Sequence, residues 1–306
     1  MINSVLTSFG IKLAKASELR LPSFDSSTKS WPNNYQDNIL FINQAKEMFA
    51  NKSKVLITGA GYEKNFLSYV SQTNGWIRSG VHWTNFIEGF PIDIMGSAHI
   101  SPLEASMHSV NRPKILVHGV YSKVPPCLCN SFVMRWSDPY LSKQFNGVPS
   151  TQDIIQLISE KSLGVAPYLP IVRNSIFFLS TIFLWLGAKE LVFTGVDPLN
   201  PQYFFKDNLS VKIEIGKSLS MCNPWLGEWD GRNERIPAIK RSTSHNIQHF
   251  INSILQSTSA VGGDDYIFEF HRGFKLIKNL ADFMNARLYY VGNSSFMKET
   301  GLKRVG

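Results

Sequence analysis

The sequence predicts an α/β fold with one doubly wound, mostly parallel sheet of the Rossmann type. Short apolar segments without polar alternation recur along the chain, which is typical of parallel strands that helices cover on both faces. The first of these segments, residues 54–61, ends in Gly59, Ala60 and Gly61, and a helical pattern follows it. A buried strand that ends in a glycine-bearing loop is the usual opening of a nucleotide-binding unit.

The expected elements follow this pattern in order. An N-terminal segment, residues 1–50, combines a polar, turn-rich extension (1–35) with a helical pattern, and it precedes a main domain of residues 51–306. Strands are predicted at 54–61, 76–78, 92–96, 114–119, 190–195 and, last in the chain, 287–292. Helices are predicted at 36–50, 152–161, 173–186, 244–256 and 270–285. Residues 198–243 have few apolar runs and are predicted to form a long loop or lid.

The composition indicates a globular chain with a basic surface. Of the 306 residues, 43% are hydrophobic and 18% are charged, and the formal net charge is +8. This charge is typical of a solvated basic face, or of an acidic partner such as nucleic acid, an anionic membrane or an anionic substrate. No motif in the sequence indicates nucleic acid. Three cysteines without metal-ligand spacing indicate free thiols in a reducing compartment. The N-terminus lacks a secretory pattern and no apolar run could span a bilayer, so we expect a cytoplasmic protein.

Polar residues stand where two of the predicted elements begin or end. Arg173, Asn174 and Ser175 precede the apolar helix, and such side chains at a helix start can bind an anion or a nucleotide. An ordinary helix cap beside a surface arginine is the alternative. Gly195 and Asp197 end a buried strand, where a carboxylate would reach the crevice in which α/β proteins bind ligands. An Asx-type turn before Pro198 is the alternative there.

The loop at Gly59 and Gly61 also has two interpretations. It could bring backbone close to a phosphate or a ribose at the carboxyl end of its strand. It lacks the third glycine of the dinucleotide fingerprint, because Lys64 stands at that position. A tight turn from strand to helix is therefore the alternative.

Two histidines supply the candidate general base. His245 and His249 are four residues apart and would share one face of the helix predicted over 244–256. No third metal ligand is evident nearby in the sequence, so acid–base chemistry is favoured over a metal site. The chain also lacks the Asp-X-Asp motif of metal-dependent sugar transferases. A monophosphate donor, with no metal or other cofactor, fits this pattern better than a diphosphate donor.

In this order, the motifs resemble the bacterial lipo-oligosaccharide sialyltransferases of glycosyltransferase family 42. The matching segments are 173–176 (Arg-Asn-Ser-Ile), 187–191 (Gly-Ala-Lys-Glu-Leu), 195–197 (Gly-Val-Asp), 203–205 (Tyr-Phe-Phe), 244–249 (Ser-His-Asn-Ile-Gln-His), 288–289 (Leu-Tyr) and 293–294 (Asn-Ser). The resemblance covers roughly residues 54–297. It implies a single-domain, GT-A-like fold of the Rossmann type, with the lid over 198–243.

The resemblance also implies roles for particular residues. The donor would be a sugar acid activated with cytidine monophosphate (CMP), and the acceptor a glycan or glycolipid in lipopolysaccharide biosynthesis. His249 would take the proton from the acceptor hydroxyl, Tyr203 would hydrogen-bond the departing phosphate, and Arg173 would face the phosphate or the sugar carboxylate. The residues that would bind substrate are Gly59, Ala60, Gly61, Asn174, Ser175, Gly195 and His245. The reaction would invert the anomeric centre without a metal.

Departures from the family pattern leave alternatives open. Leu199 replaces a second tyrosine, Ala60 replaces an asparagine, and Ser79 and Gly80 stand where Cys-Asn is expected. The sugar could therefore be a sialic acid, Kdo, legionaminate or pseudaminate. Asp197 could act as the nucleophile of a retaining enzyme, or the chain could bind sugar nucleotides without turnover. The basic charge suits work at the inner membrane surface, and a homo-oligomer remains open.

Overall fold

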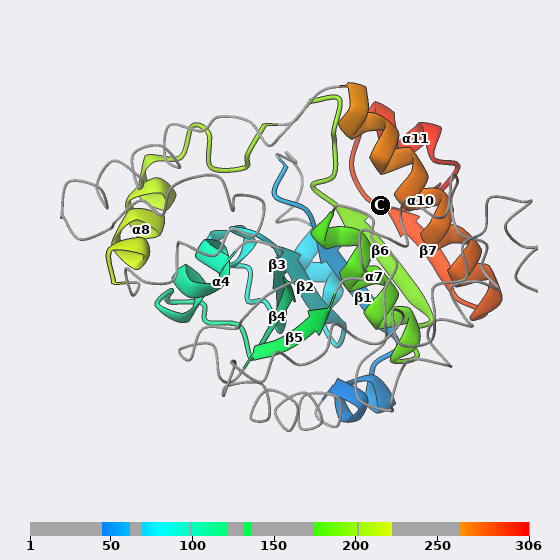
Figure 1. Ribbon diagram of the computed structural model, residues 1–306, viewed down its shortest axis with the longest axis horizontal. Helices are drawn as coiled ribbons and strands as arrows, with labels where there is room; N and C mark the ends of the chain where they lie inside the picture. The colour runs from blue at the N-terminus through cyan, green and yellow to red at the C-terminus, as the bar shows by residue number, and fades with distance from the viewer. Residues whose placement is uncertain are drawn as a thin grey trace, which may run out of the picture.

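The structure, a computed structural model, describes residues 45–61, 69–97, 100–120, 131–135, 174–200, 202–221 and 264–305. Within this part of the chain it is an α/β fold, as predicted, built around one eight-stranded sheet (Figure 1). The strand order is β5-β4-β3-β2-β1-β6-β7-β8, and each neighbouring pair in it is parallel.

The described elements have the following bounds. The strands are β1 (Lys54–Thr58), β2 (Ile77–Val81), β3 (Ile94–Ser97), β4 (Ile115–Val120), β5 (Ser131–Arg135), β6 (Glu190–Thr194), β7 (Arg287–Tyr290) and β8 (Lys303–Arg304). The α-helices are α4 (Ile100–Met107), α7 (Ser175–Trp185), α8 (Leu209–Ser220), α10 (Asp264–Phe283) and α11 (Ser295–Glu299). Two 3₁₀ turns are η1 (Ser71–Thr73) and η2 (Thr84–Phe86), and residues 45–51 are also helical.

The order of the strands reverses between β1 and β6. From β1 the sheet grows through β2, β3, β4 and β5 to one edge, whereas β6 lies on the other side of β1 and is followed by β7 and β8. This is the doubly wound arrangement of Rossmann-like sheets. The boundary between β1 and β6 is its topological switch point, where ligands of such sheets bind outside the carboxyl ends of the strands.

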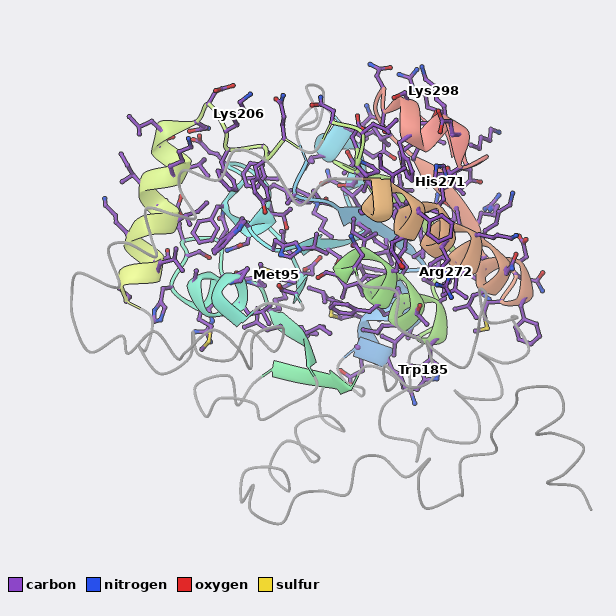
Figure 2. The ribbon with its side chains drawn as sticks, turned by 45° about the horizontal axis from the view of Figure 1, so that its top comes forward. Met95, Trp185, Lys206, His271, Arg272 and Lys298 are labelled. Carbon is purple, nitrogen blue, oxygen red and sulfur yellow. The ribbon has the colours of Figure 1, made fainter. Side chains whose placement is uncertain are left out.

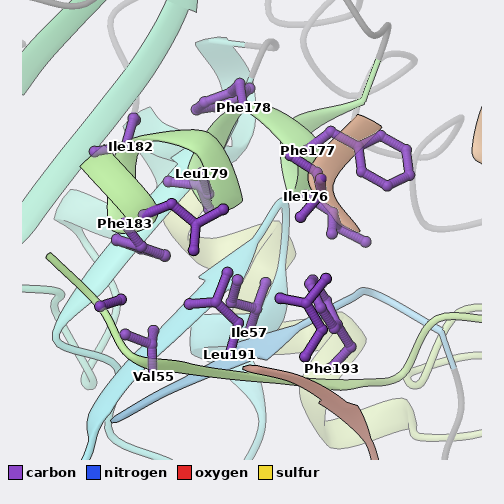
Figure 3. Close-up of a cluster of buried hydrophobic side chains, with 14 of the residues drawn as sticks. Val55, Ile57, Ile176, Phe177, Phe178, Leu179, Ile182, Phe183, Leu191 and Phe193 are labelled. Atoms are coloured by element: carbon purple, nitrogen blue, oxygen red, sulfur yellow. The ribbon is translucent and has the colours of Figure 1, made fainter. Parts of the chain in front are cut away.

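Alternate residues of the central strands face two different hydrophobic cores, because side chains of a strand point to opposite faces in turn. The sheet residues that face α7 include Val55, Ile57, Leu191 and Phe193 (Figure 3). This first core also contains residues of α10 and α11. The second core lies on the other face and includes Leu56, Val192 and, from α4, Leu103. Helices therefore cover both faces of the sheet.

Helix α7 is apolar all round because it is buried all round. Residues 175–184 are all buried, between the sheet and α10. Asn174, in extended conformation, caps the helix by accepting a hydrogen bond from the Ile176 N–H at 2.8 Å. Gly187 stops it in a left-handed conformation with φ +101°. Among the described residues, no helix has the length and apolar character needed to cross a membrane.

The structure corrects several sequence predictions about elements. The last strand is β8, not the one at 287–292, and β5 was not predicted at all. Strand β8 is two residues long with exposed side chains, so it carries no apolar signal. Helix α10 begins at Asp264 rather than at residue 270. Its first turns include the exposed Phe268, which weakens the amphipathic pattern there.

The prediction of a long irregular segment over 198–243 is wrong for its first part, because α8 lies within it. Val211, Ile215 and Leu219 recur every four residues along α8 and pack in a third core with Trp83 and Phe86. This stripe is a helical signal. It is hard to see in the sequence because exposed apolar residues, Leu209 and Ile213, interrupt the polar face.

Some predictions lie outside the described residues. These are the extension over 1–35, the helices over 152–161 and 244–256, the second half of the predicted lid, and the three cysteines. The helix predicted over 36–50 is described, and confirmed, from residue 45 onward. The boundary between residues 1–50 and the main domain stays a prediction.

Candidate functional site

The carboxyl ends of β1 and β6 are joined by backbone hydrogen bonds that continue beyond both strands. The Gly59 N–H donates to the Thr194 carbonyl at 2.8 Å, and the Gly61 N–H donates to the Gly195 carbonyl at 2.9 Å. The two glycine-containing segments that the sequence placed at strand ends therefore lie side by side at the switch point.

Close packing explains why these positions are glycines. A Cβ atom on Gly61 would lie 2.6 Å from the Gly195 carbonyl oxygen, and one on Gly59 would lie 3.0 Å from the Gly195 carbonyl carbon. Gly195 has φ +63°, and its own Cβ would lie 2.6 Å from the Gly59 carbonyl oxygen. Any side chain would force the two segments apart. The glycines thus allow the two backbones to touch at the switch point.

The structure brings Tyr203 to the same loop. Tyr203 forms an isolated antiparallel bridge with Gly61, and the Phe204 N–H donates to the Ala60 carbonyl at 3.1 Å. The Tyr203 ring stacks on Phe205, with 4.9 Å between ring centroids and 12° between ring planes. Because Phe205 is fully buried, the tyrosine is held against a fixed support. In Figure 1 the segment after β6 runs from the top of the sheet across to α8.

Asp197 also lies just beyond the carboxyl end of β6. Its backbone nitrogen lies 3.8 Å from the position of a Cβ on Gly61. Its carbonyl accepts from the Asn200 N–H at 3.2 Å, which forms a backbone turn and not the Asx-type turn given as the alternative. The carboxylate Oδ1 is buried and has no hydrogen-bond partner among the described residues.

Asn174 and Ser175 also lie at the carboxyl ends of the strands. The end of α7 lies at the amino ends of the strands, because the Lys189 N–H that follows it donates to the carbonyl of Ser53, just before β1, at 2.8 Å. Since α7 runs antiparallel to the strands, its first residues lie at their carboxyl ends. Asn174 acts there as the helix cap, so the cap interpretation is correct for this residue. A contact with nucleotide stays a prediction.

The remaining predicted site residues, Arg173, His245 and His249, lie outside the described residues. Their roles stay predictions. Within the described parts of the chain, no group of three His, Cys, Asp or Glu side chains could hold a metal ion.

Sequence reasoning missed a set of hydroxyl groups at this edge. Among the described residues, the buried side-chain atoms without a hydrogen-bond partner are the hydroxyl oxygens of Thr58, Ser79, Thr84 and Thr194 and the Oδ1 of Asp197. Thr58 and Thr194 are the last residues of β1 and β6, Thr84 and Asp197 lie just beyond β2 and β6, and Ser79 is the middle residue of β2. Thr58 and Thr194 could have been noticed as the polar last residues of two otherwise apolar strands.

His82 was also missed. It follows β2 directly and adopts a left-handed conformation with φ 56°, which is uncommon for a residue other than glycine. Its N–H donates to the Gly96 carbonyl at 3.3 Å, so the strained residue is tied to the carboxyl end of β3. No sequence pattern signals a positive φ at a histidine.

Tyr69 is the other hydroxyl of interest near these strands, in the second core. Burial, with a smaller contribution from the charge of Glu190, raises the pKa of this side chain above its ordinary value. Its hydroxyl therefore stays protonated at neutral pH and is unsuited to act as a base.

Comparison with known proteins adds no relative to this picture. No family model, no curated protein and no solved structure matches the chain.

Proposed function

We propose that the chain is a glycosyltransferase that moves a sialic-acid-type sugar from a CMP-activated donor to a glycan acceptor without a metal. The observation that carries the proposal is the set of backbone contacts at the switch point. Two segments far apart in the sequence meet there: the loop at Gly59, and the segment that runs from the strand end at Asp197 to Tyr203. A nucleotide at this place has the fold's usual ligand position, beside backbone that can approach it closely.

In the proposed reaction, His249 takes the proton of the acceptor hydroxyl as that oxygen attacks the anomeric carbon of the sugar. The bond from this carbon to the CMP phosphate breaks, and the phosphate leaves with the electron pair. The Tyr203 hydroxyl donates a hydrogen bond to the leaving phosphate, where negative charge accumulates. Its stacking on Phe205 would hold this donor in position before the reaction begins.

The test is turnover of a donor series by the purified protein. We expect transfer or slow hydrolysis of at least one CMP-sugar acid, among CMP-sialic acid, CMP-Kdo, CMP-legionaminate and CMP-pseudaminate. His249→Ala should lower kcat by about 10²- to 10⁴-fold through loss of the base. His108→Ala is the matched control. It is exposed and is not among the predicted site residues, so turnover should be unchanged.

Two further outcomes separate the alternatives. Asp197→Asn would abolish transfer if Asp197 were the nucleophile of a retaining reaction, whereas in the proposed inverting reaction some transfer persists. Determining the anomeric configuration of the product by NMR gives the same answer independently. Binding of CMP without turnover of any donor would indicate a sugar-nucleotide-binding protein, and absence of both binding and turnover would refute the proposal.

We also propose that the basic surface of the chain holds it at an anionic membrane that carries a glycolipid acceptor. Exposed basic side chains gather on α10, α11 and β8, namely Lys275, Lys278, Lys298, Lys303 and Arg304, and we call this set the C-terminal basic face. Figure 2 shows Lys298 on α11 close to α10, while Lys206 lies across the molecule near α8.

A further inference from the structure

His82 lies at the carboxyl end of the strand next to the switch point. It follows β2 directly, and β2 is paired with β1, one of the two switch-point strands. Thr58, the last residue of β1, is paired with Gly80, so His82 lies just beyond that level of the sheet. Its N–H donates to the Gly96 carbonyl at 3.3 Å, which ties it to β3. His82 therefore lies at the same edge of the sheet as the candidate site.

His82 is also the residue of this stretch that reaches the surface. Residues 79–86 run from the middle of β2 through η2, and all of them are buried except His82, which is partly exposed. Its neighbours Val81, Trp83 and Thr84 are 2%, 5% and 0% exposed. A molecule at this edge can therefore reach His82 but not the buried side chains on either side of it.

The third core links His82 to Tyr203. Trp83, the residue after His82, belongs to this core together with Phe205, and the partly exposed Tyr203 packs against it. Phe205 also stacks on the Tyr203 ring. Two accessible residues whose side chains can form hydrogen bonds are thus mounted on one small core at one edge of the sheet.

The backbone of His82 is left-handed without a local reason. Among the described residues, His82 and Asn285 are the two other than glycine with a positive φ, 56° and 52°. Asn285 stops α10, where the Ala286 N–H donates to the Ala281 carbonyl at 2.8 Å, and this kind of helix stop needs a left-handed residue. His82 follows a strand, where no such stop is needed. Because glycine would adopt this conformation at lower cost, we expect the imidazole to contribute something that glycine cannot.

The position of His82 after the glycine loop indicates which part of a ligand it would meet. In Rossmann-type sheets, a carboxylate about 20 residues after the glycine-rich loop hydrogen-bonds a ribose hydroxyl of the nucleotide. His82 follows Gly61 by about this distance, and residues 79–87 contain no carboxylate. An imidazole nitrogen can donate or accept a hydrogen bond, so it can make the same contact with a hydroxyl.

We propose that His82 hydrogen-bonds a ribose hydroxyl of a bound nucleotide and makes the site selective for ribonucleotides over deoxyribonucleotides. The inference rests on the proposed function only for the identity of the base. It makes His82 a specificity-determining residue, because a site that hydrogen-bonds a hydroxyl of its ligand discriminates against the analogue that lacks it.

The test compares binding of CMP with that of its 2′-deoxy and 3′-deoxy forms by calorimetry. The wild-type protein should bind CMP about tenfold more tightly than at least one deoxy form, which corresponds to one lost hydrogen bond. In His82→Gly the preference should fall to within about twofold, with an unchanged or higher Tm because glycine suits the positive φ. His82→Asn keeps a hydrogen-bonding group and tolerates the same backbone, so its preference should exceed that of His82→Gly.

Asn285→Gly is the matched control. It replaces the other left-handed residue in the same way, but it lies just before β7, at the amino ends of the strands and away from the candidate site. It should leave both the CMP affinity and the preference for ribose unchanged. An equal loss of preference in this variant would assign the effect to the backbone and not to the imidazole, and would overturn the inference.

The remaining outcomes distinguish this inference from the proposed function. If CMP binds but its deoxy forms bind equally well, or if the preference survives in His82→Gly, the inference is wrong and the proposed function stands. If CMP does not bind, the same comparison is made with AMP, GMP and UMP. A ribose preference that His82→Gly loses then supports the role of His82 and removes the proposed function. Absence of binding by all four nucleotides refutes both.

Discussion

Gly80 shows how one residue without a side chain shapes the candidate site. The resemblance to family 42 predicts an asparagine at this position, yet a Cβ there would lie 2.7 Å from the Ile92 Cδ1 and 2.9 Å from the Thr84 Cβ. Both neighbours are buried, at 4% and 0% exposure. The side chain of Thr84 thus fills the space that an asparagine would need, and a hydroxyl replaces an amide at this edge.

We therefore expect Gly80→Ala to be destabilising even though alanine is small. The added methyl group must displace Thr84 or Ile92 in a packed core, which should lower the free energy of unfolding by about 1–3 kcal/mol. Chemical denaturation would measure this, with the neighbouring Ser79→Ala as the control, since it adds no atoms. An unchanged midpoint for Gly80→Ala would show that the turn at η2 can move aside at no cost.

At the scale of elements, the contact between α7 and α10 positions the start of α7 at the edge of the site. The Phe177 ring packs against α10. It packs edge-to-face against Phe270 and Phe274, with centroid distances of 5.4 Å and 5.0 Å. Gly273 lies under the same ring, because a Cβ there would be 2.5 Å from the Phe177 Cδ2. The glycine allows the two helices to approach closely.

Gly273→Ala should lower the free energy of unfolding by about 1–2 kcal/mol, since overpacking against Phe177 outweighs the better helix propensity of alanine. Combining it with Phe177→Leu, which removes the ring, should show a coupling of at least about 0.5 kcal/mol in a double-mutant cycle. Lys275→Ala, on the exposed side of α10, is the control and should change stability by less than about 0.5 kcal/mol. Strict additivity of the cycle would contradict a direct contact.

At the scale of the whole molecule, part of the net charge of +8 lies on the C-terminal basic face. Lys278 of α10 reaches the turn after α11, since a Cβ on Gly301 would lie 3.8 Å from its Nζ. Basic side chains from a helix and a strand edge are thereby brought to one region. An anionic membrane attracts each such side chain near its surface by about 1 kcal/mol.

We expect the protein to bind vesicles that contain phosphatidylglycerol at low salt, and to be released as the salt concentration rises. The double substitution Lys298→Glu and Lys303→Glu should weaken this binding by at least about tenfold. The control is the double substitution Lys206→Glu and Lys212→Glu, near and on α8. It changes the net charge by the same amount and should weaken vesicle binding less. Equal losses in the two double variants would mean that only the total charge matters.

The outcome of the sequence predictions follows from how local each signal is. The apolar strands β1, β4, β6 and β7 were predicted within a few residues, because a buried parallel strand is recognisable from its own composition. Strand β8 was missed because it has only two exposed residues. Helix α8 was missed because its buried stripe faces a third core that no pattern in the sequence predicts.

The sequence by itself determined that Gly59, Gly195 and Asp197 stand at carboxyl ends of buried strands, since strand composition and chain direction are local properties. Only the tertiary structure decided that these two strand ends are neighbours, that Tyr203 returns to their loop, and that His82 follows the strand beside β1. Strand order and register depend on hydrogen bonds and helix packing between segments far apart in the chain, which no local periodicity encodes.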